Sequence, residues 1–340
     1  MKNQAIILMA ILILTLILYF VPCLCKTNNI HVGIFYYVWY DEGLGNRHWN
    51  SSELTTVIDK PLLGFYNSQD TYIIQKHLEW FEQLQIDFLI ISWWGPKSYE
   101  DNATKLLFQQ IANSDYKPEL AIMIEPFNET GTYNYTEIYS YIYNEYVAAY
   151  PQIYMKLYGK PLLCLYNAEN LTKNGKMPLD NRFEIRIVGH ESYANWLFYG
   201  SYEMKSWENE LVMDGQISVM PRYDDTHFRS PGAQKDPTYK EGYYDEQWSK
   251  VLKLAREGKV NYVTIATWNE YHERTQIEPC WDKTSYRKND PFYIFNKTKD
   301  YIKQLKGTIP QPIQPEIIAA IAVAAAGTTA LLKLVFRRTG

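Results

Sequence analysis

The chain has 340 residues, of which 46% are hydrophobic and 21% are charged, so it is large enough for one substantial core or two smaller ones. Its formal net charge of −4 argues against a general role in binding nucleic acid. Aromatic residues make up 16% of the chain, and the many Tyr and Trp side chains suit stacking on sugar rings as well as packing in a core.

The chain starts with a positive residue and an apolar run. Lys2 precedes an apolar stretch from Ala5 to Val21, and Cys23 and Cys25 supply small side chains at its end. This pattern predicts an export signal over residues 1–25, cleaved after Cys25. An uncleaved N-terminal anchor is the alternative, because the run is long for a signal. Either way, the segment lies outside the folded body.

The body, residues 29–306, alternates strand-like runs with helix-like ones. The predicted strands are His31–Tyr37, Asp87–Trp93, Leu120–Ile124, Pro161–Tyr166, Phe183–Val188, Asn195–Tyr199, Gln216–Met220 and Asn261–Thr267. The predicted helices are Thr71–Leu84, Tyr99–Ala112, Tyr135–Tyr150 and Asp245–Gly258.

Apolar strands that alternate with helices indicate the α/β class with a parallel sheet. Eight such strands in a chain of this length predict a (β/α)8 TIM barrel. An open doubly wound sheet is the alternative, but Gly43-Leu44-Gly45 after the first strand lacks the third glycine of a dinucleotide-binding fingerprint.

In a barrel, the functional site lies at the carboxyl ends of the strands. Aromatic, acidic and polar side chains gather at the predicted strand ends, as a carbohydrate site requires for stacking on sugar faces and binding hydroxyls. They include Tyr36, Tyr37, Trp39, Tyr40, Asp41, Ser92, Trp93, Trp94, Glu125, Tyr166, Asn167, His190, Glu191, Arg222, Tyr223, Asp224 and Asp225.

The last predicted strand ends in the most polar of these segments. The run up to Thr267 is followed by Asn269, Glu270, His272 and Glu273. Two carboxylates and an imidazole at a strand end indicate acid/base chemistry, and carboxylates three residues apart on a helical turn point the same way. A charged surface turn after a core strand is the alternative for either acid alone.

A Pro-rich linker over residues 307–316 leads to a second apolar run over residues 317–336, interrupted only by Lys333. Twenty helical residues span about 30 Å, the thickness of a bilayer core, so we expect a transmembrane helix. Arg337 and Arg338 after it favour a cytoplasmic end, which places the body outside the cell or in a lumen. A buried Ala-rich helix of the body is the alternative.

Potential glycosylation sites support an outward-facing body. Six Asn-x-Ser/Thr sequons begin at Asn50, Asn102, Asn128, Asn134, Asn170 and Asn296. The body has only two cysteines, Cys164 and Cys280, and either one disulfide or two separate buried thiols fits the sequence. No Cys/His spacing typical of a zinc site is present in the sequence.

Residues 269–279, Asn-Glu-Tyr-His-Glu-Arg-Thr-Gln-Ile-Glu-Pro, closely resemble the Asn-Glu-Trp-His-Glu-Gly-Thr-Gln-Ile-Glu signature of the endo-α-mannosidase family, glycoside hydrolase family 99. Four further blocks are similar to this family: Gly33–Tyr40, Ser92–Gly95, Ile124–Phe127 and, more loosely, Tyr223–Asp225. The resemblance therefore covers nearly the whole predicted barrel.

The resemblance implies a (β/α)8 enzyme that cleaves internal α-mannosidic bonds with retention of configuration and needs no cofactor. Glu270 would act as the base that lets the sugar's own 2-hydroxyl attack C1, which gives a 1,2-anhydro sugar. Glu273 would protonate the leaving oxygen and later act as base, for which its pKa should lie above that of a free Glu. The residues expected to bind the sugar are Tyr36, Tyr37, Trp39, Trp93, Trp94, Glu125, Tyr223, Asp224, Asn269, Tyr271 and His272.

The expected partner is thus a mannose-containing oligosaccharide or polysaccharide, and the expected location is the cell membrane with the catalytic domain extracellular or lumenal. Two departures from the family signature bear on the substrate. Tyr271 replaces Trp and is expected to keep an aromatic wall, whereas Arg274 replaces Gly and is expected to narrow a subsite or favour an anionic substrate.

Two alternatives remain. A non-catalytic glycan-binding protein of the cell surface would keep the fold and the aromatic residues, but it has no need of two acids at this spacing. Family 99-like proteins found near polysaccharide-assembly genes are the other alternative, although they lack the His272-Glu273 pair. A zinc protease is excluded, because Gln276 stands where the motif His-Glu-x-x-His requires its second His.

Overall fold

The structure is a computed structural model, and it describes most of the predicted body. The described residues are 30–43, 47–49, 57–127, 134–166, 168, 179–189, 195–197, 212–226, 242–282 and 290–306. The predicted signal (1–25), linker (307–316) and transmembrane helix (317–336), together with Asn167, His190 and Glu191, lie outside them. No helix within the described ranges is long and apolar enough to cross a bilayer.

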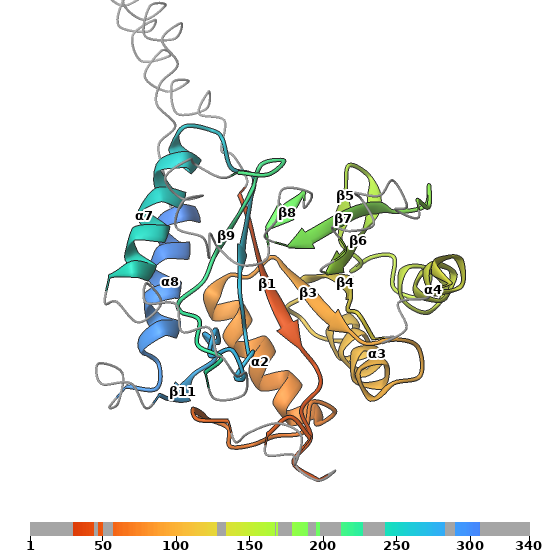
Figure 1. Cartoon of the computed structure of the whole chain (residues 1–340), viewed down its shortest axis with the longest axis horizontal. Helices are drawn as coiled ribbons and strands as arrows, with labels where there is room; N and C mark the ends of the chain where they lie inside the picture. Colours follow the sequence, from red (N-terminus) through yellow and green to blue (C-terminus); the bar gives the residue numbers. More distant parts are fainter. Residues whose placement is uncertain are drawn as a thin grey trace, which may run out of the picture.

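The centre of the fold is a curled parallel sheet (Figure 1). Its parallel strands are β1 (His31–Tyr37), β3 (Phe88–Trp93), β4 (Glu119–Ile124), β6 (Lys160–Tyr166), β7 (Glu184–Gly189), β8 (Trp196–Leu197), β9 (Gln216–Val219) and β10 (Tyr262–Ile265). Short antiparallel pairs are added by β5 (Lys156–Leu157) on β6 and by β2 (Lys60–Pro61) with β11 (Cys280–Trp281).

The order of the strands is that of a barrel. Hydrogen-bonded neighbours follow the order β8-β7-β6-β4-β3-β1-β10-β9, so β1 pairs with both β3 and the last parallel strand, β10. The two ends of this order, β8 and β9, lie in contact, although no β8–β9 ladder is found between the described residues. The eight predicted strands are therefore confirmed, with the direction and order expected of a (β/α)8 barrel.

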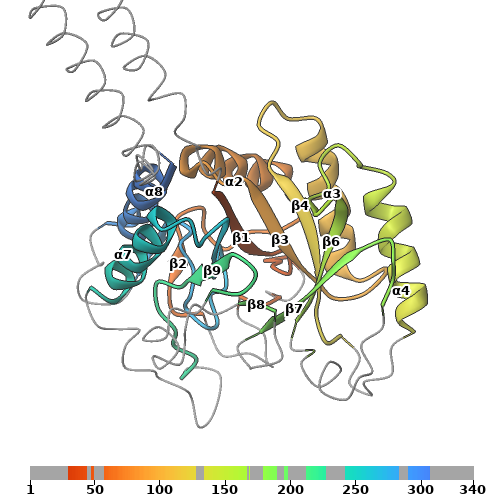
Figure 2. The ribbon, with the colours of Figure 1, turned by 90° about the horizontal axis from the view of Figure 1, so that it is seen from above.

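Helices cover the outside of the curled sheet (Figure 2). They are α2 (Thr71–Leu84), α3 (Tyr99–Ala112), α4 (Tyr135–Ile142), which continues as a π-helix (Tyr143–Val147), α7 (Tyr243–Arg256) and α8 (Tyr293–Lys306). The side chains of Asp70, Ser98 and Asn134 accept backbone N–H groups at the first turns of α2, α3 and α4. Such caps satisfy donors that a helix start leaves unpaired. The bounds of α2 and α3 are those predicted from the sequence, whereas α8 was not predicted.

The strand side chains divide into two layers because successive residues of a strand face opposite sides of the sheet. In β1, Val32, Ile34 and Tyr36 pack in the outer layer against the helices. Phe35 and Tyr37 instead pack inside the curled sheet. This alternation decides which residue at a strand end can face the barrel mouth.

The two body cysteines are separate. Cys164 and Cys280 are both free and buried, so the disulfide alternative is wrong and the alternative of two buried thiols is confirmed. Burial raises the pKa of the Cys280 thiol to about 12, which keeps it protonated and unreactive at neutral pH.

Candidate active site

The loop that follows β10 is folded into a tight turn, which we call the β10 loop (residues 266–279). The backbone N–H of Glu270 donates to Oγ1 of Thr267 at 2.9 Å, and the N–H of Thr275 donates to the Glu270 carbonyl at 3.1 Å. The hydroxyls of Thr267 and Thr275 lie 2.9 Å apart. Oε1 of Glu270 accepts the backbone N–H of His272 at 2.8 Å, which fixes the orientation of this carboxylate.

Asn269 joins the β10 loop to the end of β1. Its Oδ1 accepts the backbone N–H of Tyr37 at 2.9 Å, while its Nδ2 donates to the carbonyl of Tyr37 at 2.8 Å and to the hydroxyl of Tyr66 at 3.0 Å. The amide is fully buried. Predicted to bind the sugar, Asn269 is placed instead as a clamp between two strand ends.

The charges of three carboxylates act on the hydroxyl of Tyr37. Burial raises the pKa of the Tyr37 hydroxyl well above its usual value, and the charges of Glu125, Glu270 and Glu273 raise it further. The pKa of Glu125 in turn responds to Glu273. The two acids predicted from the β10 loop therefore share one compartment with a third acid from the end of β4.

Glu125 is held in its protonated form near neutral pH. Burial and, to a smaller extent, the charge of Glu273 raise its pKa to about 8, although the hydrogen bond from Ser92 opposes the shift. Oγ of Ser92 donates to Oε1 of Glu125 at 2.8 Å and accepts the indole N–H of Trp94 at 3.0 Å. A neutral carboxyl at this place can donate a hydrogen bond to a sugar hydroxyl.

Tyr223 brings a hydroxyl to the second acid of the pair. Its hydroxyl donates to Oδ2 of Asp225 at 3.0 Å and lies 3.4 Å from Oε1 of Glu273. The backbone N–H of Asp224 donates to the Glu273 carbonyl at 2.8 Å. The segment after β9 and the β10 loop are therefore joined at Glu273.

Rings line the site beside the carboxylates. The ring centroid of Trp39 lies 5.9 Å from that of Trp94 and 6.0 Å from that of His272. His48 stacks on Trp39 at 4.4 Å, and burial together with His272 and Arg47 lowers the pKa of His48 to about 3. His48 was not predicted from the sequence, because a lone His in a loop is part of no recognisable motif.

Five predicted sugar-binding residues lie elsewhere than at this compartment. Tyr36 and Trp93 face the outer layer, where the Tyr36 hydroxyl lies 2.9 Å from Nδ1 of His77 and the Trp93 indole donates to Asp101 at 2.9 Å. Asn269 is the clamp described above. Tyr271 is almost fully buried and donates its hydroxyl to Glu278 at 2.9 Å, so it is a core residue and not an aromatic wall.

Asp224 is the fifth of these predicted sugar-binding residues. It belongs to a buried group of charges together with Arg274, which replaces the Gly of the family signature. Nη1 of Arg274 donates to Oδ2 of Asp224 at 3.0 Å, while Nε and Nη2 donate to the two carboxylate oxygens of Asp59 at 2.9 Å each. The backbone of Arg274 has a φ of 54°, a region that favours glycine and explains the Gly of the family signature. The guanidinium of Arg274 is therefore surrounded by carboxylates of the protein itself.

The part of the chain that the structure describes contains no group of three or more His, Cys, Asp or Glu side chains placed to hold a metal ion. The chemistry that the site offers on its own is proton transfer by carboxyl groups next to sugar-binding rings.

Comparisons with known proteins bear on the class of enzyme that the chain resembles. Residues 46–177 match the family described as Glycosyl hydrolase family 99. The chain is 25% identical over 347 residues to the glycoprotein endo-alpha-1,2-mannosidase of Rattus norvegicus, with 80% of this chain and 74% of the relative covered. It is also 25% identical over 293 residues to the Mus musculus protein of the same name, with 71% and 62% covered.

The fold is similar to a solved structure of the GH99 endo-alpha-mannosidase from Bacteroides thetaiotaomicron. The TM-score is 0.61 at 23% identity, and the match covers 82% of this chain and 97% of the other. Fold, site and relatives together define a glycoside hydrolase. The predicted resemblance to glycoside hydrolase family 99 is confirmed over residues 46–177, and the chain is similar to proteins that are named endo-alpha-1,2-mannosidases.

Proposed function

We propose that this chain cleaves internal α-mannosidic bonds of a mannose-containing oligosaccharide or polysaccharide with retention of configuration. The observation that supports the proposal is that Glu270 and Glu273 on the β10 loop and Glu125 after β4 all act electrostatically on the buried hydroxyl of Tyr37. A retaining glycosidase needs one carboxyl group to protonate the leaving oxygen and a second to generate the attacking group.

In the proposed reaction, Glu270 accepts the proton of the sugar's 2-hydroxyl while that oxygen attacks C1, so that a 1,2-anhydro sugar forms. The bond from C1 to the leaving oxygen breaks at the same time, and Glu273 gives that oxygen its proton. Water then attacks C1 and gives a proton to Glu273, while the bond from C1 to O2 breaks and Glu270 returns its proton to O2, which restores the 2-hydroxyl and the α configuration. The hydrogen bond from the His272 N–H holds the Glu270 carboxylate in place for its step.

The main test compares Glu270→Gln and Glu273→Gln with the wild type on α-mannan and mannose-rich glycans. Loss of a positioned acid or base lowers the rate by roughly 10²- to 10⁴-fold, so we expect release of oligosaccharide to fall by that factor in both variants. Glu246→Gln, on the exposed face of α7, is the matched control and should keep full activity. Binding of glycan without release by the wild type would favour the non-catalytic alternative.

A second test addresses the attacking group. A substrate whose scissile mannose lacks the 2-hydroxyl should bind but not be cleaved, because the nucleophile is missing. Cleavage of this 2-deoxy substrate at the wild-type rate, or isolation of a glycosyl ester on either Glu270 or Glu273, would contradict the 1,2-anhydro route and leave a glycosidase with an enzyme nucleophile.

A further inference from the structure

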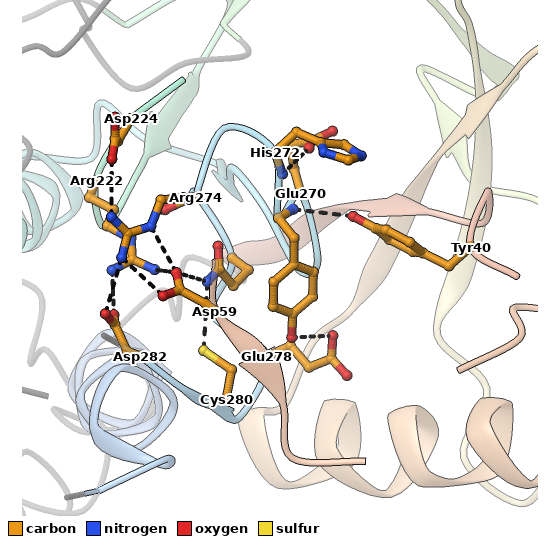
Figure 3. Close-up of polar contacts among 12 residues, drawn as sticks. Tyr40, Asp59, Arg222, Asp224, Glu270, His272, Arg274, Glu278, Cys280 and Asp282 are labelled. Atoms are coloured by element: carbon orange, nitrogen blue, oxygen red, sulfur yellow. Dashed lines mark hydrogen bonds and ion pairs between the residues drawn. The ribbon is translucent and has the colours of Figure 1, made fainter. Parts of the chain in front are cut away.

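The charges around Arg274 form a group, the arginine–aspartate cluster, defined as Asp59, Arg222, Asp224, Arg274 and Asp282. Arg222 donates from Nη2 to Asp59 at 2.5 Å and from Nη1 to Asp282, and Nη2 of Arg274 lies 3.3 Å from Asp282. All five side chains are buried. Figure 3 shows the cluster on one side of the β10 loop and Tyr40 on the other.

The pKa values of Asp59 and Arg222 in the cluster are shifted toward their charged forms. Burial alone would raise the pKa of Asp59, but the neighbouring Arg222 and Arg274 hold it well below its usual range. Burial likewise opposes the charge of Arg222, yet Asp59 and Asp282 raise its pKa above the usual value. The cluster is therefore an ionic crosslink between the segment before β2, the segment after β9 and the end of β11.

The main chain beside Glu273 is tied to this crosslink at two points. Nε of Arg222 donates to the carbonyl of Arg274 at 2.5 Å. The N–H of Asp224 donates to the carbonyl of Glu273 at 2.8 Å. Because Arg274 directly follows Glu273 and its own side chain lies in the cluster, the peptide units on both sides of Arg274 are fixed.

The segment from Arg222 to Asp225 links the cluster to the carboxylate of Glu273. The side chains of Arg222 and Asp224 enter the cluster. Those of Tyr223 and Asp225 form the hydrogen bond beside Oε1 of Glu273. Side chains of an extended segment alternate in this way, so fixing one set fixes the place of the other.

We infer that Arg274 and Asp59 are positioning residues. Through the arginine–aspartate cluster they fix the position of the acid Glu273 relative to its neighbour Tyr223. The inference rests on the proposed function of Glu273 as the acid. It gives a role to the one residue of the β10 loop whose charge departs from the family signature, and it predicts that disturbing the cluster impairs proton donation more than sugar binding.

The test uses a pair of substrates that differ in their need for an acid. An α-linked manno-oligosaccharide requires protonation of its leaving oxygen, whereas the corresponding glycosyl fluoride releases fluoride without a proton donor. We expect Arg274→Gln and Asp59→Asn to lower kcat on the oligosaccharide by roughly 10- to 100-fold, with KM changed little and with a much smaller loss on the fluoride. Arg182→Gln, which breaks a partly buried ion pair with Asp180 outside the cluster, is the matched control.

The outcomes are distinct. Equal losses on both substrates, or no loss in either variant, would overturn the inference. If Arg274→Gln does not fold, Asp59→Asn still decides, because it keeps the shape of the side chain and removes only one charge. Wild-type protein that cleaves neither substrate, while the variants fold normally, would instead contradict the proposed function itself.

Discussion

Tyr36 and Tyr37 are neighbours in the sequence, and both were predicted to bind sugar, but the pleat of β1 separates them. Tyr37 lies among three carboxylates inside the sheet, and Tyr36 contacts His77 of α2 outside it. Two adjacent tyrosines therefore have different surroundings. Substituting each of them separately distinguishes their roles.

We expect Tyr37→Phe to lower kcat at nearly unchanged stability, because the hydroxyl faces the proposed reaction site. Tyr36→Phe should leave kcat close to that of the wild type. It removes a buried partner of His77, and an unsatisfied buried polar group costs about 1–3 kcal/mol of the free energy of unfolding. Steady-state kinetics and urea denaturation of both variants check this; the reverse pattern would mean that the site lies on the helix side of the sheet.

Glu125 should make the stability of the protein depend on pH. Its pKa is raised from 4.5 to about 8 in the folded protein, so the folded state binds a proton that the unfolded state releases. The resulting stabilisation is complete below about pH 4.5 and is lost as the pH rises through about 8, with a total on the order of a few kcal/mol.

Glu125→Gln, which cannot titrate, should remove this dependence. The measurement is the difference in unfolding free energy between the wild type and Glu125→Gln from pH 5 to 9. His48 is present in both proteins, so its own titration cancels. A difference that does not change with pH would show that Glu125 is ionised in the fold.

The acids of the β10 loop could be predicted from sequence, because Glu270 and Glu273 follow an apolar strand within a specific motif. For the residues at the other strand ends, the side of the sheet on which each side chain lies could not be predicted. In a parallel sheet both faces of a strand are buried, so the hydropathy of β1 or β3 does not indicate which of two adjacent aromatic residues points inward. The role of Arg274 could not be predicted either, because its partner Asp59 is 215 residues away in the sequence.

At the scale of elements, β1 and β3 are packed so closely that one position excludes any side chain. Gly33 pairs with Phe88 in the register of the two strands. A Cβ at Gly33 would lie 2.1 Å from Cε2 of the Phe88 ring, far inside van der Waals contact. This glycine is therefore needed for space and not for an unusual backbone angle.

Gly33→Ala should accordingly destabilise the fold by about 1–3 kcal/mol or more, the usual cost of overpacking a core. Adding Phe88→Leu should recover part of the loss, so the double variant would be more stable than the sum of the single changes predicts. Thermal and denaturant unfolding of the three variants measure the coupling. Additive losses would mean that the cost of Gly33→Ala does not come from its clash with the ring of Phe88.

The strands themselves were predictable because each is a short apolar run bounded by polar residues. The helix α8 was not recognised, although Ile294, Phe295, Ile302 and Leu305 give it a buried stripe. Its polar face is crowded with Lys residues, and only the packing against α2 and α7 shows that the stripe is covered. Tertiary contact, more than local pattern, stabilises such a helix.

At the scale of the whole molecule, the sequence predicts an exported body that is held at a membrane by residues 317–336. Two sequons on described helices allow a test of the export. Asn102 on α3 and Asn296 on α8 are both exposed and make suitable acceptors for glycan. Asn134 is exposed as well, but its side chain also caps α4, so its substitution would mix two effects.

We expect the full-length chain, expressed in a eukaryotic cell, to fractionate with membranes and to lose mass when treated with an endoglycosidase that removes N-linked glycans. The double variant Asn102→Gln/Asn296→Gln should lose correspondingly less mass, because two carriers of glycan are gone while the fold keeps its packing. A chain that ends at Lys306 should be secreted with its glycans and its activity intact, since every described helix and strand lies before that residue. Full-length protein that carries no glycan and is soluble after cell lysis would show that the body faces the cytoplasm and that the run over residues 317–336 does not span a membrane.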